Sequence, residues 1–166
     1  MALAIAIFVI GIVSAVLPST PAPAPTSIRT VDRSITRIER DGEQLWIFST
    51  LPEAVTGDQG YLISAADVSA RIGKGVKAEL AGAPKNLSGI NIKFRVPGAD
   101  RLGNPGTANF MTIEYPASDL RAANYKGLEP LGVLNLASSV SIYPSKDVRD
   151  FCKGGGLDDF CAKALR

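Results

Sequence analysis

The stretch ITRIERDGEQLWIF, residues Ile35–Phe48, predicts a β-hairpin near the start of the folded domain. β-Branched and aromatic residues flank Asp41-Gly42, a dipeptide that favours a two-residue type I′ turn. The expected cross-strand pairs are a charge pair, an apolar pair and a cation–π pair: Arg40 with Glu43, Ile38 with Leu45, and Arg37 with Trp46. A helical spacing of apolar residues is also present, at Ile28, Val31, Ile35 and Ile38. We favour the hairpin because the turn signal and the three pairs agree.

Starting from the second strand of the hairpin, the order strand, loop, strand, helix and strand occurs twice along the chain. The first set is Leu45–Phe48, Tyr61–Ile63, helix Ala65–Ile72 and Val76–Leu80, and the second is Ile90–Val96, Phe110–Tyr115, helix Ala117–Tyr125 and a final strand Val133–Tyr143. The two sets are an internal duplication or a chance agreement. They predict an α+β fold: a β-rich single domain of about seven strands, with short C-terminal helices in Lys146–Arg166 and a preceding N-terminal apolar helix.

The beginning of the chain is apolar and is followed by a proline-rich stretch. A helix over Ala2–Leu17 would be roughly 24 Å long, a little short of a ~30 Å hydrocarbon core. We predict that residues 1–17 are a transmembrane anchor or an uncleaved signal, with cleavage after Val13-Ser14-Ala15 as the alternative and a buried core helix as a third. Residues 18–27 form a Pro/Ala-rich linker that would extend as a polyproline II spacer. The domain itself comprises residues 28–166.

The two cysteines, Cys152 and Cys161, lie on either side of three consecutive glycines. The chain contains no histidine, so a four-ligand metal site is not predicted, and the spacing is not that of a C-x-x-C redox pair. We predict one structural disulfide, worth about 2.5–3 kcal/mol in the chain-entropy model, with two free buried thiols as the alternative. A disulfide would place the domain in an oxidising space outside the cytoplasm.

Charge and motifs give little support for catalysis or for nucleic-acid binding. The net charge is +2, so no nucleic-acid partner is predicted. The lack of histidine excludes Ser-His and Cys-His nucleophile pairs, although a Ser-Lys pair using Lys74, Lys93 or Lys146 stays open. Gly73–Ala78 matches a dinucleotide-binding fingerprint, but Gly82 and Pro84 would end any helix that followed it. We therefore predict a protein without catalytic residues, cofactor or metal.

Two long loops are the predicted binding surface. Pro97–Ala108 is longer than most hairpin loops, and long loops in small domains are often functional. Its candidate binding residues are Asp100, Arg101, Leu102 and Asn104, and those of the corresponding first-half loop, Leu51–Gly60, are Glu53 and Asp58. If the halves are related, both loops could form one recognition edge. The alternative is two solvated loops that bind nothing.

These features predict a non-catalytic accessory or assembly subunit of a cell-envelope membrane complex. The chain would contact the lipid bilayer through residues 1–17 and bind protein subunits through a domain on the periplasmic or extracellular side. A first alternative is a soluble periplasmic or secreted binding protein whose signal peptide is cleaved. A second is an exported hydrolase that uses carboxylates or a Ser-Lys pair.

Overall fold

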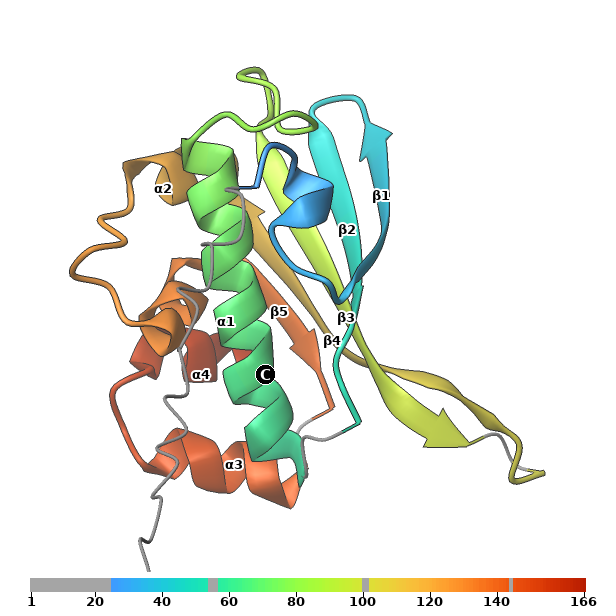
Figure 1. Cartoon of the computed structure of the whole chain (residues 1–166). Coiled ribbons are helices and arrows are strands. Elements are labelled where there is room, and N and C mark those ends of the chain that lie inside the picture. The colour runs from blue at the N-terminus through green and yellow to red at the C-terminus, as the bar shows by residue number, and fades with distance from the viewer. Residues whose placement is uncertain (1–24, 54–56, 100–101, 144) are drawn as a thin grey trace, which may run out of the picture.

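In the computed structural model, which describes residues 25–53, 57–99, 102–143 and 145–166, five strands form one mixed sheet with the helices on one of its faces (Figure 1). The strands are β1 (Ile35–Asp41), β2 (Gln44–Thr50), β3 (Gly89–Ala99), β4 (Pro105–Pro116) and β5 (Ser139–Ile142), and they follow one another in this order across the sheet. Only β2 and β3 are parallel neighbours; the other pairs are antiparallel. The predicted α+β class is confirmed, but the described residues contain five strands and not about seven.

The helical elements are η1 (Ile28–Thr30), α1 (Gly57–Lys77), α2 (Ala117–Ala122), η2 (Pro130–Leu136), α3 (Lys146–Lys153) and α4 (Asp158–Ala164), where η marks a 3-10 helix. α1 connects β2 to β3, because two parallel neighbours need a long crossover connection. The short C-terminal helices α3 and α4 confirm the prediction for the end of the chain.

The predicted hairpin is confirmed as β1 and β2, but its predicted register is wrong. Asp41 pairs with Gln44, so the two turn residues are Gly42 and Glu43. Gly42 has a φ of 57°, and a positive φ at the first turn position favours glycine there, as in a type II′ turn. Each β1 residue therefore pairs two positions further along β2 than expected, which leaves every side chain on its expected face. As a result, the guanidinium of Arg37 lies 3.9 Å from the ring centroid of Phe48 and not over Trp46.

The first predicted set of elements is wrong after β2. Tyr61–Ile63, predicted as a strand, lies inside α1, and the predicted strand Val76–Leu80 is the end of α1 and the turn after it. The buried side chains of α1 recur at helical spacing: Leu62, Ala65, Ala66, Ser69, Ile72 and Val76. With one long helix in place of strand, helix and strand, the first half does not repeat the second, so of the two alternatives the internal duplication is wrong.

The predicted final strand Val133–Tyr143 is also wrong over its first half. Residues Pro130–Leu136 form η2, and only Ser139–Ile142 form a strand. Val133 and Leu134 are adjacent in the chain and both fully buried. A strand with one solvated face would expose one of them, whereas a tight helical turn buries both against α1. α2 agrees with its predicted start but ends at Ala122, before Tyr125.

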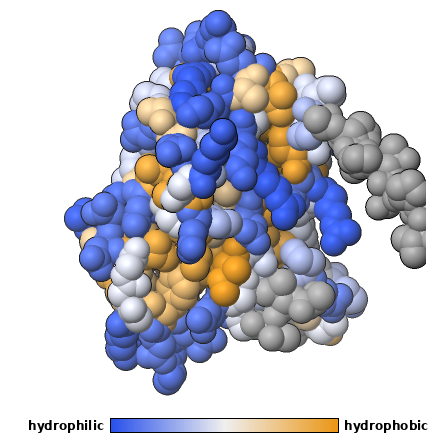
Figure 2. All heavy atoms as spheres, turned by 60° about the vertical axis from the view of Figure 1, so that its left-hand side comes forward, coloured by the Kyte–Doolittle hydropathy of each residue, from blue (hydrophilic) through white to orange (hydrophobic). Residues whose placement is uncertain are grey.

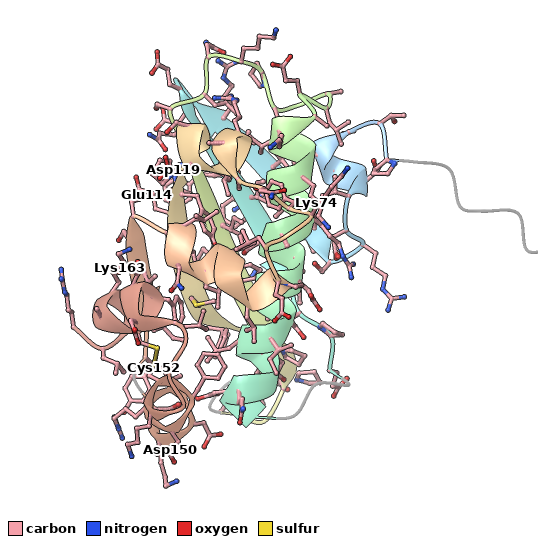
Figure 3. The ribbon with its side chains drawn as sticks, turned by 90° about the vertical axis from the view of Figure 1, so that its left-hand side faces the viewer. Lys74, Glu114, Asp119, Asp150, Cys152 and Lys163 are labelled. Atoms are coloured by element: carbon pink, nitrogen blue, oxygen red, sulfur yellow. A yellow bond between two sulfur atoms is a disulfide. The ribbon has the colours of Figure 1, made fainter. Side chains whose placement is uncertain are left out.

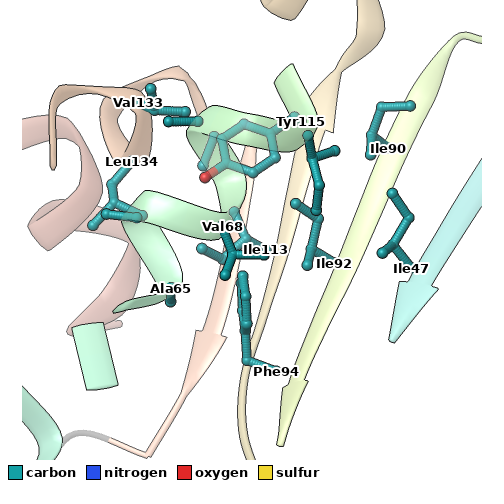
Figure 4. Packing of buried hydrophobic residues seen from close by; sticks show 14 of the residues in the cluster. Ile47, Ala65, Val68, Ile90, Ile92, Phe94, Ile113, Tyr115, Val133 and Leu134 are labelled. Atoms are coloured by element: carbon teal, nitrogen blue, oxygen red, sulfur yellow. The ribbon is translucent and has the colours of Figure 1, made fainter. Parts of the chain in front are cut away.

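The hydrophobic core lies between α1 and the face of the sheet that the helices cover (Figure 4). Side chains from the three central strands are fully buried there, including Ile47, Ile90, Ile92, Phe94, Ile113 and Tyr115. Alternate residues of the same strands point to the opposite face, which none of the described helices covers (Figure 1).

The predicted disulfide is confirmed: Cys152 of α3 is bonded to Cys161 of α4, with their Cα atoms 5.6 Å apart (Figure 3). The bond indicates an extracytoplasmic domain. Residues 1–17 and most of the linker lie outside the described residues. Among the helices that are described, none is long and apolar enough to cross a membrane.

Candidate functional site

The main candidate site is a two-stranded arm that projects from one end of the sheet (Figure 1). β2 ends at Thr50, which pairs with Arg95, and β5 ends at Ile142, which pairs with Met111. Beyond these positions β3 and β4 pair only with each other, through residues 96–99 and 105–108, which we call the arm. Most of the predicted loop Pro97–Ala108 is therefore strand, and only residues 100–104 connect the two strands.

Neither edge of the arm pairs with a described strand, although the Thr107 carbonyl oxygen accepts a hydrogen bond from the Arg95 guanidinium. Within the part of the chain that the structure describes, no strand lies beside the arm on the side of β2 or on the side of β5. Its residues are small, apolar or proline, and none is charged. Uncharged strand edges can pair with another chain, and an isolated hairpin is only marginally stable in water. The arm therefore has two uncharged strand edges at which another strand could pair.

Several exposed apolar side chains lie at the same end of the molecule. β2, β3 and β5 all run towards this end, so Glu53, the arm and Tyr143 lie there together with the start of α1. Leu102 and Tyr143 are 78% and 82% exposed. Ile63, in the second turn of α1, is 44% exposed. We call the arm, residues 102–104, Glu53, Ile63 and Tyr143 the arm end.

The base of the arm is fixed to α1 by an aromatic contact. The rings of Tyr61 in α1 and Phe110 in β4 lie 5.5 Å apart, and both side chains are partly buried against the core. On the helical side, apolar surface is visible in both the upper and the lower half of the view, between hydrophilic side chains (Figure 2). The arm end thus combines a rigid base with an exposed apolar surface.

The predicted binding residues do not all lie on the arm end. Leu102, Asn104 and Glu53 are exposed at the arm end, whereas Asp100 and Arg101 lie outside the described residues. Asp58 is half-buried, and its carboxylate accepts a hydrogen bond from the Ser145 hydroxyl, which also caps α3. Asp58 therefore joins α1 to α3. The two predicted loops do lie at one end, because β2 and β3 are parallel.

Sequence reasoning did not identify Tyr143 and Ile63 as parts of the arm end. Tyr143 was predicted in a long strand and Ile63 in another, so neither was expected to be exposed at the end of the sheet. The only signal for Tyr143 was a large aromatic residue directly after the alternating segment Ser139–Ile142.

A second feature is a cavity of about 330 Å³ between α1 and the ends of β1 and β2. The buried carboxylate of Asp32 lies in its wall, where it accepts hydrogen bonds from the Ser34 backbone N–H, at 2.8 Å, and from Arg71. Asp67 and Arg33 also line the cavity, and neither forms an ion pair with any described residue. The cavity therefore presents one carboxylate and one guanidinium that are available to a small polar ligand.

The described residues show no group of acidic or cysteine side chains arranged to hold a metal ion. Of the lysines considered for a Ser-Lys pair, Lys74 and Lys146 are exposed. The hydrogen bond to Asp150 raises the pKa of Lys146, which is the opposite of what a nucleophilic or basic lysine needs. Lys93 is half-buried on the helix-free face of the sheet.

Comparison with protein-family models, with curated proteins and with solved structures found no match.

Proposed function

We propose that the protein is a non-catalytic accessory or assembly subunit of a membrane complex in the cell envelope, and that it binds a protein partner through the arm end. The observation that supports this most directly is the arm, whose two edges pair with no described strand and which lies at the same end of the sheet as the exposed residues Leu102 and Tyr143. A partner strand can hydrogen-bond to such an edge while its side chains contact the neighbouring apolar residues.

The arm end has the composition expected of a small protein-binding surface. Burying an aromatic side chain removes about 150–250 Å² from water, and exposed aromatic residues are common anchors of interfaces. Tyr143 and Leu102 are the most exposed large apolar side chains among the described residues. Proline at positions 97 and 105 removes one N–H donor from each strand of the arm, which limits the registers in which a partner strand can pair.

The proposed anchor and spacer would hold the arm end near its membrane partner. Residues 18–25, if extended, reach about 25 Å at the ~3.1 Å rise of polyproline II. The intact mass of the protein isolated from its host tests this part of the proposal. We expect a mass that includes residues 1–15. A mass that begins near Val16 would contradict the anchor and favour a soluble exported protein.

The partner-binding role can be tested by isolating the full chain from native membranes in mild detergent. We expect Leu102→Asp and Tyr143→Asp to reduce the co-purifying subunits at least tenfold, because each places a charge in the proposed contact. Lys85→Asp is the matched control: its side chain is 81% exposed and lies in the α1–β3 connection, at the opposite end of the sheet. Equal co-purification of all three variants, with unchanged melting temperatures, would contradict the proposal.

The cavity beside Asp32 supports a second candidate, a soluble binding protein for a small ligand. Its volume is near the lower limit for ligand sites, and Asp67 and Arg33 suit a ligand with an ammonium and a carboxylate group. Amino acids at millimolar concentration should then raise the melting temperature of the wild type but not of Asp67→Asn. No stabilisation by any of them would remove this candidate.

A further inference from the structure

The face of the sheet opposite the helices carries charged and aromatic side chains in two adjacent rows. The strand register gives an acidic row of Glu39, Trp46, Asn91, Glu114 and Ser139, and a basic row of Arg37, Phe48, Lys93, Thr112 and Ser141. In the described part of the chain, the helices all lie on the other side of the sheet (Figure 1). We call these ten residues the open face.

The aromatic residues of the open face are not part of the hydrophobic core. Trp46 and Phe48 are half-buried, and neither belongs to the buried cluster or packs against it. Arg37 covers the Phe48 ring and also contacts Glu39 at 3.1 Å, with both charged side chains more than half exposed. A sheet face that carries large apolar side chains is normally covered by another structural layer. The layer that covers the open face should therefore match its aromatic residues and its two rows of charge.

We infer that a second copy of this chain covers the open face, related by a two-fold axis that runs across the strands between the two rows. This rotation places the acidic row of each copy over the basic row of the other. Glu39 then faces Arg37 of the second copy, and Trp46 faces Phe48 of the second copy. A surface that matches itself in this way forms a closed, symmetric dimer.

A two-fold axis along the strands would be unfavourable, because it would place the acidic row on the acidic row. Other classes of occupant match the pattern less well. A polyanion that followed the basic row would meet Glu39 and Glu114 one row away, and a neutral glycan would supply no charge opposite Glu114 or Lys93. A second copy supplies the complementary charges in the correct order.

The helix-free side of the sheet, with the open face at its centre, is large enough for such an interface. β1, β2 and the parts of β3 and β4 beside them are about seven residues long, and β5 is four, so a strand spacing of about 4.8 Å and a rise of about 3.3 Å per residue give roughly 500 Å² per copy. The two copies together would bury about 1,000 Å², the lower limit expected of a specific interface. The resulting dimer would have two sheets at its centre, helices on both outer sides, and two arms.

Trp46 is the only tryptophan in the chain, so its fluorescence reports directly on the open face. In detergent solution, the full chain should have the mass of two copies at high concentration, with the Trp46 emission at short wavelength. Dilution should shift the emission to longer wavelength at the same concentrations at which the mass falls to that of one copy.

Charge reversal separates this dimer from any other association. Arg37→Glu places acid against acid across the axis, so we expect its dissociation constant to rise at least tenfold. The double variant Arg37→Glu/Glu39→Arg exchanges the two charges and should restore the dimer, while the control Lys85→Glu should behave as the wild type. The inference is overturned if the wild type is monomeric throughout, or if Arg37→Glu dimerises as well as the wild type. It is also overturned if oligosaccharides or acidic peptides shift the Trp46 emission while the protein stays a single copy.

Discussion

Removal of the Cys152–Cys161 bond should destabilise the domain by an amount that follows from the length of the loop it closes. The cysteines are nine positions apart, and the chain-entropy relation then gives about 2.6 kcal/mol at 25 °C. Both cysteines are only half-buried, so replacement by alanine adds little packing loss. For a domain of about 140 residues the unfolding entropy is about 0.3 kcal/mol/K, so the melting temperature should fall by roughly 9 °C.

The assay is thermal unfolding of the full chain, followed by circular dichroism, for the wild type and for Cys152→Ala/Cys161→Ala. Reductant should lower the melting temperature of the wild type towards that of the variant and leave the variant unchanged. A fall in melting temperature of less than about 3 °C, or about 1 kcal/mol, would refute the reasoning. The bond would then not restrict the unfolded state of the part of the chain that unfolds cooperatively.

Three further predictions concern interactions other than the disulfide. Asp58→Ala removes the acceptor for the Ser145 hydroxyl, so we expect a loss of about 1–2 kcal/mol in urea unfolding, whereas Glu53→Ala, which is exposed, should change little. The stability of the domain should also fall at both extremes of pH. Hydrogen bonds from two lysines of α3 lower the pKa of Asp150 to about 2, so its contribution is present above pH ~4 and is lost as the pH falls from about 4 to 2. Burial raises the pKa of Tyr125 to about 12, so stability is retained below pH ~10 and is lost as the pH rises from about 10 to 12. Asp150→Asn should flatten the acid limb, and an unchanged acid limb in that variant would contradict the assignment.

The hairpin and the disulfide could be predicted from sequence because each has a strong local signal. Asp41-Gly42 lies between alternating strands, and the cysteines have no histidine with which to share a metal. The long helix could not be recognised, because Tyr61–Ile63 is a short apolar run that suits a strand as well as a helix. What distinguishes the two is the parallel pairing of β2 with β3, which requires a crossover and is not visible in the local sequence.

The arm was missed for a related reason. Proline and glycine at positions 97, 98, 105 and 106 are rare in strands, so the segment was predicted as a loop. It is strand because the pairing of β3 with β4 continues outwards from the core. The residues predicted from loop length, Leu102, Asn104 and Glu53, nevertheless all lie at one end of the sheet. Tyr143 could not be placed until the boundary between η2 and β5 was known.

Site-specific photo-crosslinking in native membranes tests the central claim most directly. A photoreactive phenylalanine analogue would replace Leu102, Tyr143 or, as a control of matched exposure, Lys85 in the full chain. We expect positions 102 and 143 to crosslink to the same membrane-associated protein, and position 85 to give no such product. The account would be contradicted if positions 102 and 143 gave no product, or if position 85 captured the same protein with equal yield.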